Sequence, residues 1–141
     1  LYTSINYEEF KMSKSINVPK LRFKEFSGEW KEKKFADIYD FFQTNSFSRA
    51  LLNYESGDVK NIHYGDIHTK FKSNFFIYKE KVPFISAEID ISKIKDENYC
   101  QIKDLIIADA SEDYNDIGKA IEIIELNGEK LVAGLHTYIH I

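Results

Sequence analysis

Two polar segments in the middle of the chain carry side chains whose types suit contacts with a nucleic acid. The first polar segment, residues 45–49, offers an amide, two hydroxyls and a guanidinium. The second polar segment, residues 63–72, offers imidazoles, a phenol and ammonium groups. The residues are Asn45, Ser46, Ser48, Arg49, His63, Tyr64, His68, Lys70 and Lys72. Amides and guanidinium groups pair with base edges, and cations bind phosphates. Their chemistry makes these nine residues the candidates for contacts with DNA. The competing interpretation is that both segments are ordinary polar surface loops.

The cluster of His63, Asp66 and His68 has ligand types that zinc accepts, which raises a small metal-dependent hydrolase as a further interpretation. If residues 59–64 form a strand, Gly65 and Asp66 turn the chain, and the two imidazoles need not converge. We favour a structural role, in which Gly65 allows the turn and Asp66 caps the next segment. No metal or other cofactor is expected.

An acidic run later in the chain consists of Asp109, Glu112, Asp113 and Asp116. Its spacing is not that of a calcium-binding loop, so we expect a solvated loop with Asx turns and a helix cap. The sequence has no glycine-rich phosphate loop, no Gly-x-Ser-x-Gly, no catalytic Cys/His signature and no S-adenosylmethionine motif. The one cysteine, Cys100, is expected to be a buried structural thiol. These observations predict a protein that is not itself an enzyme.

Hydrophobic periodicity predicts the elements that hold these side chains. Phe35, Ile38, Tyr39 and Phe42 follow the spacing of one helical face, so a short helix ending by residues 43–45 is expected. Before it, residues 18–23 should be extended, with a turn at Ser27-Gly28. Further elements are a short helix over 49–53 capped by Ser46 or Ser48, and strands over 59–64, 105–108, 118–126 and 131–141. An Asn127-Gly128 hairpin turn would make the C-terminal third a β-meander.

Composition indicates one ordered domain or a part of one. The chain has 141 residues, 43% of them hydrophobic and 15% aromatic, with a net charge of −4. Residues 41–81 hold six basic and four acidic side chains, whereas residues 82–130 hold five basic and twelve acidic ones. The acidic total argues mildly against nucleic-acid binding, but the basic middle third keeps that function open. No apolar run reaches the roughly 20 residues of a membrane helix, and a single cysteine suits a reducing cytoplasm.

Three stretches, taken in order, resemble the specificity subunits of type I restriction-modification systems. The first is Val18-Pro19-Lys20-Leu21-Arg22-Phe23 with Phe26, Gly28 and Trp30 after it. The second, residues 61–67, is a strand followed by Gly-Asp-Ile. The third and most specific covers residues 103–113 and continues through 117–119 to 133–137. Each stretch alone is a weak signal, and the three in order are a strong one.

The resemblance implies an α/β fold of the α+β type, with a curled, mostly antiparallel sheet and short helices. It implies that residues 18–141 form a first target-recognition domain, truncated at its C-terminus, and that residues 1–17 are a leader or upstream extension. One such domain reads half of a split target in double-stranded DNA. The modification (methyltransferase) and restriction subunits of the same system are the implied partners.

The resulting hypothesis is a cytoplasmic, non-catalytic DNA-recognition domain with no membrane association. The alternative is a truncated protein-interaction module that binds methyltransferase subunits without DNA, and the acidic segment over residues 82–130 motivates it.

Overall fold

The computed structural model describes residues 18–42, 44–111, 113–134 and 136–140. The expected leader, residues 1–17, lies outside the described residues. The chain divides into two units, residues 1–37 and residues 38–141, and each is considered by itself.

The described part of the first unit is extended, with one turn and one short helix. Gly28 has a φ of 88°, which glycine adopts without strain, and Nη1 of Arg22 donates to its carbonyl oxygen at 2.9 Å. The hydrogen-bonded turn, however, lies at Lys24-Glu25, where the N–H of Phe26 donates to the carbonyl oxygen of Phe23 at 3.1 Å, and Gly28 is a bend, so the turn predicted at Ser27-Gly28 is displaced. Residues 18–23 contain no helix, as expected, but the chain bends at Lys20-Leu21. The unit ends in the 3-10 helix η1 (Phe35–Asp37).

The predicted helix over residues 35–42 is wrong beyond its first turn. Residues Phe41–Phe42 form strand β1 instead, antiparallel to β9 (Thr137–His140), with Phe42 opposite Ile139. Aromatic residues are common in strands as well as on the buried faces of helices. At Phe41 and Phe42 the pairing with β9, far away in the sequence, favours the strand over the helix.

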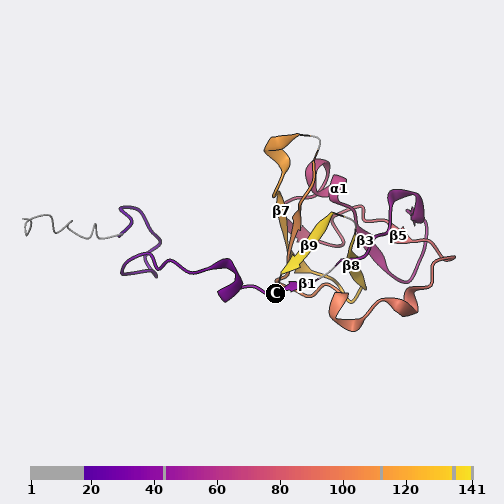
Figure 1. Ribbon diagram of the computed structural model, residues 1–141, viewed down its shortest axis with the longest axis horizontal. Coiled ribbons are helices and arrows are strands. Elements are labelled where there is room, and N and C mark those ends of the chain that lie inside the picture. The colour runs from indigo at the N-terminus through magenta and orange to yellow at the C-terminus, as the bar shows by residue number, and fades with distance from the viewer. Residues whose placement is uncertain (1–17, 43, 112, 135, 141) are drawn as a thin grey trace, which may run out of the picture. The chain divides into compact units, whose positions relative to one another are not determined.

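The second unit has a mixed α/β fold in which most of the regular structure lies in two small sheets (Figure 1). The first sheet has the order β1-β9-β6-β7-β4, where β6 is Leu105–Ala108, β7 is Ala120–Glu125 and β4 is Asn74–Phe76. The second has the order β2-β5-β3-β8, where β2 is Leu52–Asn53, β5 is Phe84–Ile85, β3 is Lys60–Ile62 and β8 is Leu131–Ala133. Neighbouring strands are antiparallel except in the pairs β4–β7 and β3–β8. The strands predicted over 105–108 and 118–126 are confirmed as β6 and β7.

One hydrophobic core serves both sheets and the helix α1 (Tyr64–Thr69). Ile106 of β6 and Ile121 and Ile123 of β7 alternate with less buried neighbours, so each lies on the face turned inward. Ile62 of β3 and Ile67 of α1 are fully buried in the same cluster. Each such side chain contributes about 1.5–3 kcal/mol on burial, so the shared core holds these short strands together.

The C-terminal third differs from the predicted meander. Within the predicted strand over 131–141, Leu131–Ala133 form β8 beside β3, and Thr137–His140 form β9 beside β6 in the other sheet. A Cβ on Gly134 would lie 2.5 Å from Nδ2 of Asn61 and 2.7 Å from the carbonyl oxygen of Ile62, so only glycine fits where the chain leaves β8. The Asn127-Gly128 turn exists, with φ values of 50° and 75°, but it carries the chain from one sheet to the other and closes no hairpin.

The segment around Gly65 and Asp66 is a helix, not the predicted turn. Strand β3 ends at Ile62, and α1 begins at Tyr64 with both residues in its first turn. His63 caps the helix, because its Nδ1 accepts from the backbone N–H of Gly65 at 3.1 Å. Because the helix begins at Tyr64, the strand predicted over 59–64 is shorter than expected. The helix also places Asp66 against Arg49 of the first polar segment.

The remaining helices of the second unit are single 3-10 turns, η2 (Arg49–Leu51), η3 (Ile91–Lys93), η4 (Asp96–Asn98) and η5 (Tyr114–Asp116). The helix predicted over 49–53 is confirmed only as η2. Ser48 occupies its N-cap position without a side-chain hydrogen bond to the helix. In the part of the chain that the structure describes, no helix has the length and apolar character needed to cross a membrane.

Candidate nucleic-acid interface

The buried carboxylate of Asp66 joins the two polar segments. Arg49 of the first segment donates from both Nη atoms to its two oxygens at 2.9 Å, and Nζ of Lys70 lies 2.7 Å from Oδ1. The Asp66 side chain is 1% exposed, whereas those of Arg49 and Lys70 are 43% and 50% exposed. Burial raises the pKa of Asp66, but the hydrogen bonds from Arg49 and Lys70 outweigh it and hold the pKa below its ordinary value. Asp66 is therefore ionised, and one carboxylate anchors two cations at the surface.

Tyr54 lies at the centre of this group and brings in a third cation. Its hydroxyl accepts from Nη1 of Arg49 at 3.2 Å and from Nζ of Lys70 at 3.3 Å. Nζ of Lys81 lies 5.0 Å from the centre of the Tyr54 ring, and Nζ of Lys70 lies 5.7 Å from it. We call Arg49, Tyr54, Asp66, Lys70 and Lys81 the Tyr54 cluster. It holds three cations and one carboxylate, so it carries an excess of positive charge.

The histidines of the second segment are used within the fold. Nδ1 of His63 accepts from Gly65 and lies 3.2 Å from Nη2 of Arg49, which requires that nitrogen to be unprotonated. Burial, and then the charge of Arg49, lower the pKa of His63, in agreement with a neutral ring. The ring stacks on Tyr64 at 4.6 Å between centroids. Nε2 of His68 lies 2.9 Å from the carbonyl oxygen of Ala110. His63 is 9% exposed and His68 is partly buried, with its Nδ1 buried and without a partner in the described part of the chain, so neither is an exposed side chain.

Asn45 is also engaged internally, which argues against its predicted base contact. Its Nδ2 donates to Oδ1 of Asn61 at 2.8 Å and to the carbonyl oxygen of Ala133 at 2.7 Å. Its Oδ1 accepts from the backbone N–H of Phe47 at 2.9 Å. Both ends of the amide that would pair with adenine are thus occupied, and Asn45 fastens its loop to the ends of β3 and β8.

The predicted contact residues therefore fall into two groups. Asn45, Arg49, His63, Tyr64, His68 and Lys70 make interactions inside the fold, and Arg49 and Lys70 remain half exposed while doing so. The side chains of Ser46, Ser48 and Lys72 are exposed and have no side-chain partner in the described part of the chain.

Sequence reasoning missed Tyr54 and Lys81. Tyr54 lies between the two polar segments, and Lys81 lies beyond them. The only signal was the excess of basic residues over 41–81, which gives no indication that their side chains meet at one tyrosine.

The metal interpretation has little geometric support. Among the described residues no group of three or more histidine, cysteine, aspartate or glutamate side chains is placed to hold a metal ion. Both oxygens of Asp66 are taken by cations, and α1 directs His68 toward Ala110. In the acidic run, Asp113 caps η5 by accepting from the N–H of Asn115 at 2.9 Å, so the expected Asx turn and helix cap are confirmed.

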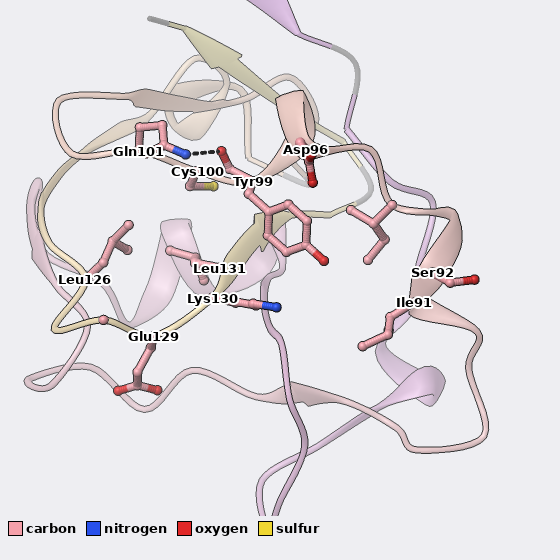
Figure 2. Close-up of a pocket in the computed structure, with 12 residues that line it drawn as sticks. Ile91, Ser92, Asp96, Tyr99, Cys100, Gln101, Leu126, Glu129, Lys130 and Leu131 are labelled. Atoms are coloured by element: carbon pink, nitrogen blue, oxygen red, sulfur yellow. Dashed lines mark hydrogen bonds between the residues drawn. The ribbon is translucent and has the colours of Figure 1, made fainter.

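A separate cavity of about 620 Å³ lies beside β8 (Figure 2). Figure 2 shows Tyr99 and Lys130 between Leu126 and Leu131 on one side and Ile91 on the other. Its Cys100 is buried, as expected, and burial raises the pKa of the thiol, which is therefore protonated. Glu129 on its rim pairs with Lys60 at 2.6 Å. The lining residues thus offer no activated nucleophile.

Models of known protein families give no match to this chain, and curated proteins give none either.

Proposed function

We propose that this protein recognises a DNA sequence as the target-recognition domain of a type I specificity subunit, reading one half of a bipartite target. The observation that carries the proposal is the junction of the two polar segments. Arg49 contacts Asp66 and His63, so residues predicted separately from sequence belong to one surface. Mixed sheets with few short helices are compatible with the α+β recognition fold that the resemblance implies.

In this proposal some side chains of that surface supply affinity for DNA, others contact base edges, and others hold these contacts in place. The half-exposed cations of Arg49 and Lys70, together with exposed Lys72, supply the electrostatic attraction on which nucleic-acid affinity depends. The exposed hydroxyls of Ser46 and Ser48 are the groups with free hydrogen-bonding capacity for base edges. Asn45 and His63 act as supports for these contacts. The protein itself makes or breaks no covalent bond in this scheme, and modification and restriction subunits act on the bound DNA.

Selection from a random pool of duplexes with the full chain tests this function. We expect enrichment of one short sequence at low salt, measured by sequencing and then by fluorescence anisotropy. Replacing both Ser46 and Ser48 with alanine should weaken the sequence preference, while Ser92→Ala, in the acidic third, should leave it unchanged. Retention of a random, unenriched pool would contradict sequence recognition.

The alternative, a protein-interaction module that binds methyltransferase subunits without DNA, draws on the acidic segment and on the cavity beside Tyr99. Capture of a modification subunit by the full chain, with no duplex retained at low salt, would favour it over DNA recognition.

A further inference from the structure

The Tyr54 cluster has a charge imbalance that the fold does not resolve. The ammonium of Lys81 contacts the Tyr54 ring and forms no ion pair with a carboxylate in the described part of the chain. Arg49 and Lys70 share the single carboxylate of Asp66. Two cations on one carboxylate repel each other, and a bound anion would relieve that repulsion.

The cluster is also held in place before any ligand arrives. Four contacts of the Arg49 guanidinium, two to Asp66 and one each to Tyr54 and His63, fix its plane. Lys70 is fixed by Asp66 and by the Tyr54 hydroxyl. Side chains already ordered lose little conformational freedom on binding, so a larger part of the interaction energy becomes affinity.

Three side chains of the cluster are partly exposed to solvent. Tyr54 is 41% exposed, and the Arg49 and Lys70 side chains are 43% and 50% exposed. The Nη atoms of Arg49 are already engaged with Asp66, Tyr54 and His63, so a bidentate contact with guanine would have to break them. A diffuse anion that interacts with several cations at once fits this arrangement better than a base edge does.

We propose that Arg49, Lys70 and Lys81, gathered around Tyr54, bind one phosphate of the DNA backbone. The inference rests on the proposed function and gives the cluster a part in it. The phosphate contact fixes the register of the duplex, and Ser48, next to Arg49 in the chain, then meets a groove edge. The contact supplies affinity that does not depend on sequence.

Lys81→Ala is the sharpest variant, and Lys130→Ala is its matched control. Both lysines are exposed and lie over a tyrosine, Lys81 at 5.0 Å from Tyr54 and Lys130 at 5.9 Å from Tyr99. Duplex affinity of the full chain is measured by anisotropy over a series of salt concentrations. We expect Lys81→Ala to weaken binding equally for all sequences and to reduce the salt slope of log K by about 1, with no change for Lys130→Ala. Equal urea midpoints confirm that both variants fold.

A second arm uses inorganic phosphate as the probe and nuclear magnetic resonance of Tyr54 and Lys81 as the readout. Resonance shifts on addition of phosphate that are lost in Lys81→Ala support the phosphate site. If these shifts occur but no duplex binds, the phosphate site stands and only the proposed DNA recognition is overturned. Duplex binding with an unchanged salt slope in Lys81→Ala overturns the phosphate site and leaves DNA recognition standing. The absence of both duplex binding and phosphate-dependent shifts would overturn the phosphate site and the proposed function together.

Discussion

Asp66 in α1 and Asp104 just before β6 are both buried carboxylates, but their surroundings are opposite. Asp66 receives hydrogen bonds from Arg49 and Lys70, and its pKa is lowered. Asp104 is 1% exposed, and its Oδ2 accepts only the backbone N–H of Gln101, while Oδ1 has no partner among the described residues. Burial raises the pKa of Asp104, and that single hydrogen bond offsets the effect only in part.

The difference shows what a buried charge needs in order to organise a surface. A carboxylate with two cations beside it holds them at fixed positions and stays ionised, because the cations repay its desolvation. A carboxylate without a cation only costs free energy when ionised. The candidate interface therefore depends on Asp66, although Asp66 itself is too buried to touch a ligand, whereas the region of Asp104 has no comparable use for its charge.

Removal of the Asp66 carboxylate should have the largest effect. We expect Asp66→Ala to lower the free energy of unfolding by about 3 kcal/mol, at the low end for breaking a buried ion pair because both cations can return to water. Urea denaturation followed by circular dichroism measures this loss. The surface variant Glu97→Ala, which removes an exposed pair with Lys95, should change stability by less than about 0.5 kcal/mol. Equal effects of the two variants would mean that Asp66 does not anchor the two cations.

Neutralising Asp104 should have a smaller effect of opposite sign. Asp104→Asn keeps an oxygen for the N–H of Gln101 and removes a buried carboxyl group whose ionisation burial disfavours. We expect a gain of about 1 kcal/mol or less at pH 7, since an amide N–H without a partner retains part of the cost. The same denaturation experiment measures it. A clear loss of stability would show that the charge of Asp104 has a cation partner after all.

The sequence did not predict that Asp66 and Asp104 have opposite surroundings, but it did predict part of the fold around them. The alternation of Ile106, Ile121 and Ile123 with less buried residues was enough to predict β6 and β7. The break between β8 and β9 was not predictable, because it depends on how closely Gly134 approaches Asn61 of another strand. Helix α1 is too short to show a period of its own, and its cap is a histidine, which is not a usual N-cap residue.

The candidate site was predictable in its location and not in its roles. Residue types directed attention to the right segments, since Arg49 and Lys70 do lie at one surface. Whether an amide such as Asn45 faces solvent or fastens a loop depends on Asn61 and Ala133, which lie far away in the chain. The meeting of Lys81 with Tyr54 likewise depends on tertiary packing alone.

The pH dependence of stability should separate the two carboxylates further. The stabilisation from Asp66, whose pKa is lowered on folding, is present above the unfolded pKa of about 3.8 and is lost as the pH falls through the folded pKa. The penalty from Asp104, whose pKa is raised, is absent below about 3.8 and grows as the pH rises through the folded pKa. Stability measured from pH 7 to pH 3 should therefore place Asp66→Ala below and Asp104→Asn above the unsubstituted protein at neutral pH. Both should approach it in acid. Differences that stay constant with pH would contradict an electrostatic origin.

The smallest expected effect concerns the Tyr54 hydroxyl, which accepts from two of the cations that Asp66 holds. Tyr54→Phe keeps the ring beside Lys81 and removes only these hydrogen bonds, so we expect a loss of about 0.5 kcal/mol, the low end for a net hydrogen bond. Tyr99→Phe is the matched control, because Tyr99 lies under Lys130 and its hydroxyl has no hydrogen bond within the described residues. It should cost nothing measurable in the same urea experiment. The effect of Tyr54→Phe should also disappear in the Asp66→Ala background, since Arg49 and Lys70 are then no longer held against the hydroxyl. If the hydroxyl instead positioned the cations without help from Asp66, the double-mutant cycle would show two additive losses.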